Sequence, residues 1–338
     1  MMKRINQLLL DKKSKALVSL AICLFTISAN SQSLKGITGT PDTSYTTFSA
    51  YQQTKKHFPD ITIVQEFNYA DVKEEKGLSY CKINHRNLLI DAFMPTGKSS
   101  KKIPAVIMIH GGGWRSGSRS QHYPLAERLA HLGYACFTPE YRLSTEALFP
   151  AAVYDIKAAI KWVKEHASTY NIDTSKIVIA GFSAGGELAA FMGTTGNMPL
   201  FKGCDCNLGT PDNVDAVVDI DGTLSFVDPE SGEGDDSKHT SAATYWFGYP
   251  KKPNKVLWEA ASPLSYVSSE TPPALFINSG VTRMHAGRED YIHVLDSNHI
   301  YSEVHTFEGA PHSFCLFNPW FEPTVKYMDD FLKKVFQK

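Results

Sequence analysis

Runs of apolar residues alternate along the chain with segments whose apolar residues recur at helical spacing. Ala105–Ile109 is a continuous apolar run, typical of a strand buried on both faces. In a later segment, Val153, Ile156, Ile160 and Val163 share one face of an expected helix. Strands separated by helices indicate βαβ crossovers and a mostly parallel sheet. The other strands expected from this pattern cover residues 88–93, 135–138, 177–180, 216–220, 274–278 and 302–307.

The helices expected from the same pattern lie around 121–132, from Pro150 onward and over 320–336. Two segments do not follow the alternation of strands and helices. Residues 32–60 are polar without a clear period, which indicates an N-terminal arm. Between Asp221 and Pro272 the sequence is rich in Pro, Gly, acidic and aromatic residues. A long irregular insertion in a regular α/β pattern is usually a lid or a substrate-binding flap, and the alternative is a structural elaboration.

Composition and charge narrow the classes of protein. The 338 residues are 43% hydrophobic and 20% charged, which is an ordinary globular composition. The formal net charge is −1 and there is no basic block, so the chain lacks the electrostatic footprint of a nucleic-acid-binding protein. Five cysteines follow residue 31, too few for a disulfide scaffold. Cys204–Cys206 (CDC) lacks a second ligand pair, so we expect a surface loop with one bridge to elsewhere and no metal site.

The N-terminus has the composition of an export signal. Basic residues precede the uncharged stretch Ala16–Ala29, and Ala29–Ser31 gives small residues at the spacing that a signal peptidase recognises. We therefore predict a signal peptide over residues 1–31, no membrane span after its removal, and a periplasmic or secreted protein. In a competing interpretation Cys23 is lipidated, but Ile22 is a poor residue before such a cysteine. Removing residues 1–31 takes away five basic groups and one acid, which changes the net charge from −1 to −5.

Ser183 stands in a sharp turn between an expected strand and an expected helix. The segment Gly181–Gly186 (GFSAGG) follows the strand at 177–180 directly. In such a turn the strand and helix backbones approach too closely for side chains, so glycines flank a serine that is exposed at the end of the strand. A serine that only caps the helix is the alternative. The strand–turn–helix context favours a nucleophile.

A second glycine-rich segment, His110–Trp114 (HGGGW), follows the buried strand at 105–109. Its glycines let backbone N–H groups face a cavity, so Gly112 and Gly113, with the N–H of Ala184, are candidates to bind an oxyanion. A plain glycine turn is one alternative, and a phosphate-binding loop is another that lacks the required Lys-Ser/Thr pair. Trp114 offers a stacking surface for a sugar ring, or packs in the core.

A general base is expected in the loop after the last strand. Serine is a poor nucleophile unless an imidazole accepts its proton. Among twelve histidines, His312 is selected by its position in Gly309–Phe314 (GAPHSF). The chain order is then serine first and histidine last.

These motifs resemble the α/β-hydrolase fold and, within it, the HGGG-type carbohydrate esterases. The resemblance implies an α/β-hydrolase catalytic domain over residues 61–338, with a mostly parallel central sheet flanked by helices and an insertion between the family's strands six and seven. More narrowly, Ala310–His312 (APH), Asn318–Phe321 (NPWF) and His285–Arg288 (HAGR) look like α/β-hydrolase-type pectin methylesterases, which demethylate polygalacturonate-rich polysaccharides.

The expected position of the triad acid departs from the family pattern. A few residues after the seventh strand, where the family has its acid, this chain has Thr282 and Arg283. A cation cannot orient an imidazole, so the acid must come from elsewhere. We expect Asp221, which follows the strand at 216–220, a position that some lipases of this fold use. The alternative is that Asp221 is only a structural buried aspartate. The other candidates are Asp219, expected to support the loop instead, and Glu289 and Asp290.

An arginine at this position also bears on the substrate. A guanidinium beside the triad is a bidentate receptor for a carboxylate, so Arg283, helped by Arg288, is expected to bind an anionic uronate chain. Arg115 and Arg119 are further possible helpers. The alternative is an ordinary ion pair of Arg283 with Glu289, Asp290 or Glu146.

The sequence therefore predicts an exported serine carboxylesterase that acts on a pectic polysaccharide or oligosaccharide, without a metal or organic cofactor. The preferred substrate is the galacturonate methyl ester, and the alternative is deacetylation of xylan or pectin. A peptidase of this fold would normally carry an added N-terminal domain, which an arm of residues 32–60 is too short to supply. A non-catalytic binding protein would usually have lost the serine or the histidine, and this chain has both Ser183 and His312.

Overall fold

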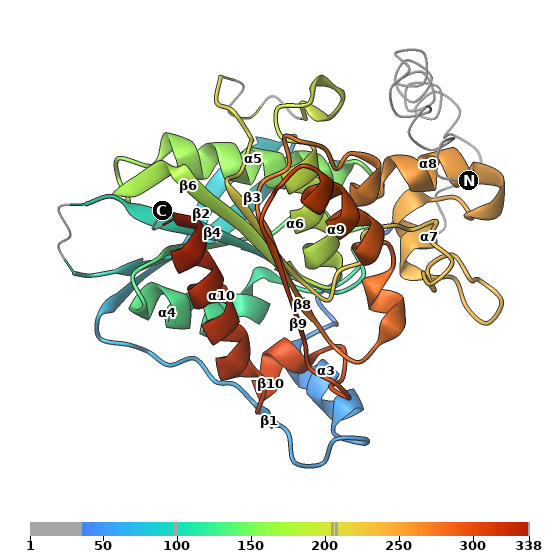
Figure 1. Cartoon of the computed structure of the whole chain (residues 1–338), viewed down its shortest axis with the longest axis horizontal. Coiled ribbons are helices and arrows are strands. Elements are labelled where there is room, and N and C mark those ends of the chain that lie inside the picture. Colours follow the sequence, from blue (N-terminus) through green and yellow to red (C-terminus); the bar gives the residue numbers. More distant parts are fainter. Residues whose placement is uncertain (1–35, 98–100, 204–205, 207–208, 337–338) are drawn as a thin grey trace.

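The computed structural model describes residues 36–97, 101–203, 206 and 209–336. The predicted signal peptide, Cys23 and Cys204 lie outside the described residues. Figure 1 shows a central sheet with helices on both of its faces.

Eight strands form the central sheet, in the order β2-β3-β5-β4-β6-β7-β8-β9. β2 pairs antiparallel with β3, and β3 pairs antiparallel with β5. The remaining neighbours in the order β5-β4-β6-β7-β8-β9 all pair in parallel. This is the mostly parallel sheet of the α/β-hydrolase fold that the sequence predicts. The strands are β2 (Val72–Ile83), β3 (Arg86–Pro95), β4 (Ile103–Ile109), β5 (Ala135–Pro139), β6 (Ile172–Phe182), β7 (Ala216–Ile220), β8 (Ala274–Asn278) and β9 (Ser302–Thr306).

The sheet separates two apolar cores because strand side chains alternate between its faces. In β4, Ile107 packs in the core with α5 and α6, while Val106 packs in the other core with α4 and α10. The larger helices are α4 (Tyr123–His131), α5 (Ala151–Glu165), α6 (Ala184–Thr194), α9 (Arg288–Ser297) and α10 (Phe321–Phe336).

Two local features differ from the sequence-based expectation. β2 was not expected, because its charged residues hide the alternation of an edge strand that pairs only with β3. Pro150 follows a cis peptide bond and caps α5 instead of lying in its first turn.

The N-terminal arm packs against the loops that follow β4 and β5. Thr38 and Gly39 donate backbone N–H groups to Thr145 O at 2.8 and 2.9 Å, and the Tyr45 N–H donates to Ser116 Oγ at 2.8 Å. The arm continues through α3 (Thr47–Thr54) to β1 (Thr62–Ile63), which pairs with β10 (Phe317–Asn318).

The insertion after β7 contains short helices and irregular chain. Its elements are α7 (Ala242–Phe247), α8 (Lys255–Ala260) and the 3-10 turns η3 (Lys252–Asn254) and η4 (Pro263–Ser265). They lie at one end of the molecule, beyond the carboxyl ends of the parallel strands (Figure 1). The remaining 3-10 turns are η1 (Arg119–His122), η2 (Pro199–Phe201), η5 (Thr282–His285) and η6 (Phe314–Leu316).

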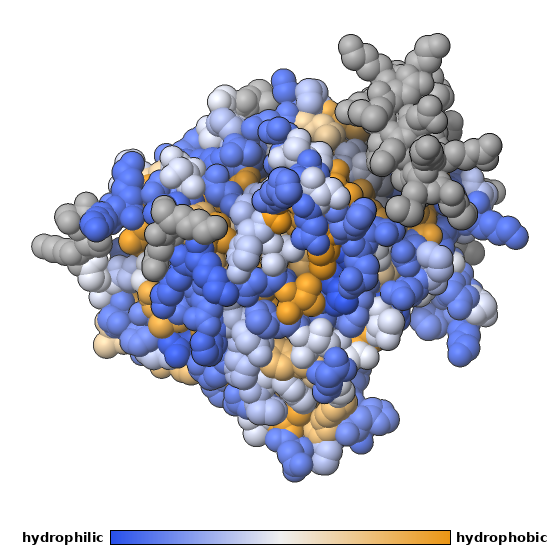
Figure 2. Space-filling model, viewed as in Figure 1, coloured by the Kyte–Doolittle hydropathy of each residue, from blue (hydrophilic) through white to orange (hydrophobic). Residues whose placement is uncertain are grey.

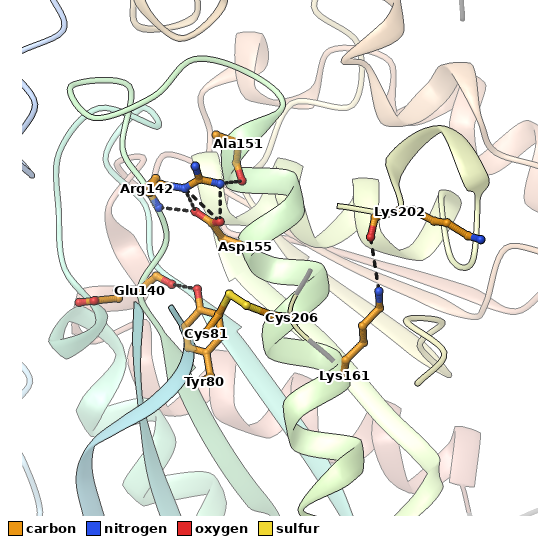
Figure 3. Close-up of a disulfide and its surroundings, with 9 residues drawn as sticks. All are labelled: Tyr80, Cys81, Glu140, Arg142, Ala151, Asp155, Lys161, Lys202 and Cys206. Atoms are coloured by element: carbon orange, nitrogen blue, oxygen red, sulfur yellow. Dashed lines mark hydrogen bonds and ion pairs between the residues drawn. A yellow bond between two sulfur atoms is a disulfide. The ribbon is translucent and has the colours of Figure 1, made fainter. Parts of the chain in front are cut away.

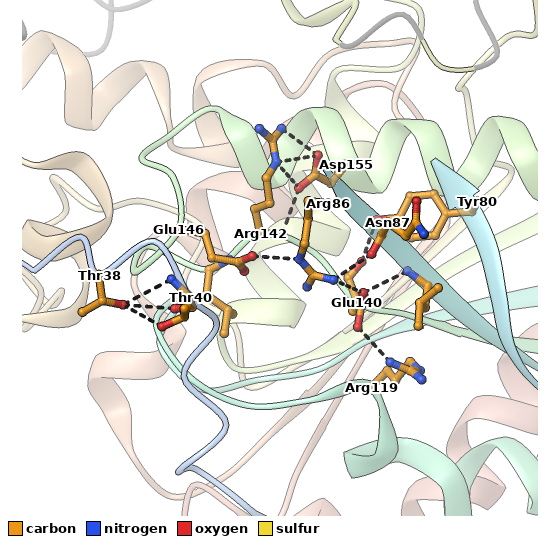
Figure 4. Close-up of polar contacts among 12 residues, drawn as sticks. Thr38, Thr40, Tyr80, Arg86, Asn87, Arg119, Glu140, Arg142, Glu146 and Asp155 are labelled. Carbon is orange, nitrogen blue, oxygen red and sulfur yellow. Dashed lines mark hydrogen bonds and ion pairs between the residues drawn. The ribbon is translucent and has the colours of Figure 1, made fainter. Parts of the chain in front are cut away.

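A disulfide and a network of ion pairs hold the edge of the sheet. Cys81 of β2 is bonded to Cys206, which fits the expected single bridge from the CDC loop (Figure 3). Arg119 Nη1 lies 2.8 Å from Glu140 Oε2, and Arg86 bridges Glu140 and Glu146 at 2.7 and 2.9 Å (Figure 4).

The surface is mixed in polarity. On the face shown in Figure 2, apolar residues occur in small patches between hydrophilic ones. Within the described ranges, no helix has the length and apolarity that a membrane crossing requires.

Candidate active site

Ser183 occupies a strained turn between β6 and α6. Its φ of 58° and ψ of −119° are unusual for a residue with a side chain. Glycines make the turn possible, because a Cβ on Gly181 would lie 2.0 Å from Gly185 O and a Cβ on Gly185 would lie 2.1 Å from Ile109 O. Local backbone packing therefore imposes the glycine pattern seen in the sequence.

The structure brings Ser183, His312 and Asp221 together in one hydrogen-bonded chain. His312 Nδ1 lies 2.6 Å from Asp221 Oδ2, and His312 Nε2 lies 2.8 Å from Ser183 Oγ. An ionised carboxylate only accepts hydrogen bonds, so Nδ1 carries the proton. In the neutral ring Nε2 is then free to accept the hydroxyl hydrogen of Ser183.

Asp221 is fixed from two sides. It follows β7 with a φ of 56° and is fully buried. Its Oδ1 accepts the Ser279 N–H at 2.8 Å, which leaves Oδ2 to face His312. His285 Nε2 lies 3.7 Å from Oδ1. Burial and the neighbouring Arg288 lower the pKa of His285, which favours its neutral form.

The other carboxylates considered for the triad lie elsewhere. Asp219 Oδ1 accepts the Gly222 N–H at 2.7 Å, so Asp219 supports the turn after β7 as expected. Burial raises the pKa of Asp219 well above its usual range, and Asp221 adds to the rise. The Glu289 side chain is 78% exposed and pairs with Arg288.

The glycine-rich loop after β4 lies beside Ser183. The Gly111 N–H donates to Gln121 Oε1 at 2.8 Å. Among the residues that the structure describes, no partner accepts a hydrogen bond from the N–H groups of Gly112, Gly113 or Ala184. Gly113 and Ala184 line the pocket at Ser183. Gly112 has a φ of 122°, and a Cβ there would lie 1.8 Å from Ser116 O, so its position excludes any side chain.

Trp114 packs inside the protein. Only 4% of its surface is exposed, and its ring stacks on Trp246 with centroids 4.8 Å apart. Its indole N–H donates to Glu187 Oε2 at 2.9 Å. Although Trp114 lines the pocket, this packing leaves little of the ring for a sugar to stack on.

Glu187 links the glycine-rich loop to the helix after Ser183. It is fully buried in the first turn of α6, and its Oε1 has no partner among the described residues. Burial raises the pKa of Glu187 well above its usual range, Asp219 adds to the rise, and the hydrogen bond from Trp114 opposes it. Burial therefore favours a neutral carboxyl.

Two buried histidines flank the same loop. Burial lowers the pKa of His110 to about 4, while Gly111 O opposes this shift and Arg119 adds to it. Burial and His110 together lower the pKa of His122 to about 3. Both rings are therefore held neutral in the folded protein.

A small pocket opens at Ser183. Its volume is about 180 Å³. One part of its wall comes from strand-end loops and the other from the insertion and η5. The lining residues are Gly113, Trp114, Ser183, Ala184, His312, Thr223, Gly232, Glu233, Ala242, Arg283 and Met284.

The arginines considered for substrate binding separate. Arg283 lines the pocket, with half of its side chain exposed and Nη1 3.7 Å from Glu233 Oε1. Its partner is thus a residue of the insertion and none of the carboxylates expected from the sequence. Arg288 does not line the pocket. Its Nη1 donates to Asn278 Oδ1 at 2.6 Å, and its Nε and Nη2 donate to Glu289.

The two possible helpers are also engaged elsewhere. Arg115 stacks over Tyr245, with its guanidinium carbon 4.1 Å from the ring centroid. Arg119 pairs with Asp91 of β3 and with Glu140, which follows β5.

One carboxylate group with metal-binding proximity occurs in the described part of the chain, away from the pocket. It comprises Glu66, Glu74 and Glu127. Lys76 Nζ lies 2.7 Å from Glu74 and 3.5 Å from Glu66. Glu127 accepts two backbone N–H groups, from Phe67 and Asn68. The Lys76 ammonium and the two backbone N–H groups are therefore partners for these three carboxylates, and the contacts need no metal ion.

Sequence reasoning missed Glu187 and Glu233. Glu187 was visible as a charged residue inside an apolar helix start, four positions after Ser183, which signals a buried partner. Glu233 carried no comparable signal, because it lies in an irregular acidic stretch.

Comparison with known proteins gives one family and a consistent fold. The BD-FAE family model matches residues 90–283. Esterase LipC of Mycobacterium tuberculosis is 31% identical over 195 residues, which are 56% of this chain and 47% of LipC. The chain spans about half the length of the curated relatives it matches.

Two solved structures share the fold. The esterase Est2 of Thermogutta terrifontis superposes with a TM-score of 0.64 at 23% identity, covering 79% of this chain and 95% of Est2. A truncated carbohydrate esterase from gut microbiota gives a TM-score of 0.64 at 23% identity, covering 80% of this chain and all of that structure. At these identities the likeness shows the α/β-hydrolase fold.

Proposed function

The chain belongs to the BD-FAE family, and from this membership and the contacts of Ser183 we propose that the protein is a serine carboxylesterase. The observation that carries the proposal is the hydrogen-bonded chain from Ser183 through His312 to Asp221, with Ser183 at a pocket. A nucleophile, a base and a group that orients the base are the minimum set for acyl transfer through a serine.

In the proposed reaction, Ser183 Oγ attacks the ester carbonyl while His312 Nε2 takes the hydroxyl proton. Asp221 holds the ring in the required tautomer and stabilises the imidazolium that forms. The protonated His312 then gives its proton to the departing alcohol, which leaves an acyl group on Ser183. Water, deprotonated by His312, attacks the acyl group. The bond to Ser183 Oγ then breaks, His312 returns the proton to Ser183 Oγ, and the acid is released.

The negative oxygen of each tetrahedral intermediate needs donors that are already in place. The N–H groups of Gly113 and Ala184, with that of Gly112, are proposed for this role. They have no internal acceptor among the described residues, so binding an oxyanion breaks no existing hydrogen bond.

We propose a galacturonate methyl ester in a pectic chain as the substrate. Arg283 supports this choice, because its guanidinium lies at the pocket and can bind the carboxylate of a uronate unit. The alternative, removal of acetyl groups from xylan or pectin, is favoured by the small volume of the pocket, about 180 Å³.

We also propose that the protein is exported. The composition of residues 1–31 supports export. The Cys81–Cys206 disulfide supports it independently, because disulfides persist mainly in oxidising compartments. Expression of the full chain in a bacterium, followed by fractionation and N-terminal sequencing, tests this. A mature chain that begins at Gln32 is expected, and uncleaved chain in the cytoplasm would contradict it.

One experiment tests the activity and separates the two substrates. The mature protein is incubated with methyl-esterified, acetylated pectin, and methanol and acetate are quantified in one NMR spectrum. Ser183→Ala provides the blank. Methanol release is expected. Acetate alone would replace the methyl ester by the acetyl ester, and release of neither product would contradict the proposed pectic substrate.

A further inference from the structure

Two opposite charges face each other at the pocket and take no part in the triad. Arg283 lies in η5 after β8, and Glu233 belongs to the insertion between β7 and β8. Their side chains approach to 3.7 Å between Nη1 and Oε1. Both residues line the pocket with Ser183 and His312. A substrate bound to Ser183 therefore lies in the electric field of both charges.

The two partners are held to different degrees. Glu233 Oε2 accepts the Ala243 N–H at 3.1 Å, and its side chain is only 18% exposed. The Arg283 side chain is 50% exposed. Within the described ranges, the Arg283 guanidinium makes no hydrogen bond at all. Glu233 is thus anchored, whereas Arg283 keeps its N–H donors available for a ligand.

A carboxylate that enters the pocket gains attraction from Arg283 but meets repulsion from Glu233, so the two effects largely cancel. We propose that Glu233 sets the charge selectivity of the pocket by offsetting Arg283. The pocket then accepts neutral and monoanionic esters alike, which suits a polyuronate whose units are partly esterified and partly free. The inference rests on the proposed function, because it assigns substrate selectivity to the same pocket.

The expected size of the effect follows from screened electrostatics. A charge at about 5–6 Å, in an effective dielectric constant of about 50–80, changes the binding free energy of a monoanion by an amount that corresponds to about 3- to 10-fold. Salt reduces the effect, because Arg283 is half exposed.

The test compares two esters that differ in charge but little in shape: 4-nitrophenyl butyrate and 4-nitrophenyl hemisuccinate. The quantity is the ratio of kcat/KM for the anionic ester to that for the neutral one. Glu233→Gln is expected to raise this ratio about 3- to 10-fold, and Arg283→Gln to lower it by a similar factor. A glutamine carbonyl can still accept the Ala243 N–H, so Glu233→Gln removes the charge and keeps the anchor.

Glu270→Gln is the matched control, because it removes an exposed carboxylate from the same insertion without touching the pocket. It is expected to leave the ratio unchanged. If Glu233→Gln behaves like Glu270→Gln, or if the double variant Glu233→Gln/Arg283→Gln keeps the raised ratio, the inference is overturned.

A binding measurement keeps this result separate from a failure of the proposed function. In the Ser183→Ala background, NMR titration with N-methyl succinamate and N-methylbutyramide gives the same charge ratio without turnover. Absence of hydrolysis of both esters would contradict the esterase activity alone. Equal binding ratios with and without the Glu233→Gln change would contradict the role of Glu233, whatever the activity.

Discussion

The pocket has two halves with different origins. One half is formed where the parallel strands end: β6 leads to Ser183, β7 to Asp221, and the loop after β9 carries His312. The other half comes from the insertion and η5, and includes Glu233 and Arg283. The first half is fixed by the backbone of a regular sheet, and the second by side chains on irregular segments.

This difference separates chemistry from selectivity. Positive φ values at Ser183 and Asp221 and the close backbone approach at Gly181 and Gly185 leave the strand-end half few alternative conformations. A preorganised site of this kind affects all substrates alike. The insertion half meets the variable parts of a substrate, so changes there alter the preference among esters.

The largest loss of activity is expected when the proposed acid of the strand-end half, Asp221, is replaced. In Asp221→Asn, the amide can still meet His312 but favours the wrong tautomer of the ring. We expect kcat to fall by about 10⁴-fold, and equally for all esters. Steady-state kinetics on butyrate and acetate esters checks this. A loss confined to one ester, or a loss below tenfold, would remove Asp221 from the triad.

Glu187 tests whether the strand-end half depends on a buried neutral acid. In Glu187→Ala the indole N–H of Trp114 is left buried without an acceptor, so unfolding free energy should fall by about 1–3 kcal/mol. The loop that carries Gly113 loses its link to α6, and kcat should fall about tenfold.

Glu187→Gln is the control, because an amide has the size and charge of a protonated carboxyl and can accept the same hydrogen bond. The free energy of unfolding should stay close to that of the unaltered protein, and kcat should stay within about threefold, as expected for an isosteric exchange. A Gln variant as impaired as the Ala variant would indicate that the carboxyl must be ionised.

The pH dependence of stability reports on the same half. His110 and His122 have pKa values of about 4 and about 3 in the folded protein, below the usual value for an unfolded chain. As the pH falls from about 6.5 toward 4, the unfolded chain takes up protons that the folded protein refuses. Stability should therefore decrease by about 1 kcal/mol per pH unit for each ring in this window, and these rings add no pH dependence above it.

Urea unfolding at pH 7.5 and pH 5 measures this decrease. In His122→Asn the decrease between the two pH values should be smaller than in the unaltered protein. An identical decrease in both would show that the pKa of His122 is the same in the folded and the unfolded states, which would contradict its lowered pKa.

In the insertion half the expected effect depends on the size of the ester. A Cβ on Gly113 would lie 2.8 Å from the Ala242 Cβ, so Ala242 stands directly against the glycine-rich loop. Ala242→Leu should narrow the pocket and lower kcat/KM about tenfold for a hexanoate ester, with little change for an acetate ester. Equal losses for both esters would mean that the insertion also positions the triad.

The sequence predicted the strand-end half well, for physical reasons. The turn at Ser183 demands glycines, the loop at Gly112 excludes any side chain, and buried parallel strands read as continuous apolar runs, so each feature leaves a local pattern. The sequence points to Asp221 because Thr282 and Arg283 stand where the family has its acid, and the structure brings Asp221 to His312.

The insertion half could not be predicted in the same way. Glu233 meets Arg283 only because an irregular segment folds back over the strand ends, and no periodic pattern encodes such a contact. The same holds for Arg288, whose partner Asn278 lies at the end of β8. β2 was missed because an edge strand with charged residues lacks the apolar alternation of a buried strand.

In the proposed reaction Ser183 is a nucleophile activated by His312. The most direct measurement is labelling of the folded protein with a fluorophosphonate probe, followed by peptide mass spectrometry, with His312→Ala as the control. We expect a single stoichiometric adduct on Ser183 that is formed far more slowly in His312→Ala. No adduct on Ser183, or equal labelling in the two proteins, would contradict it.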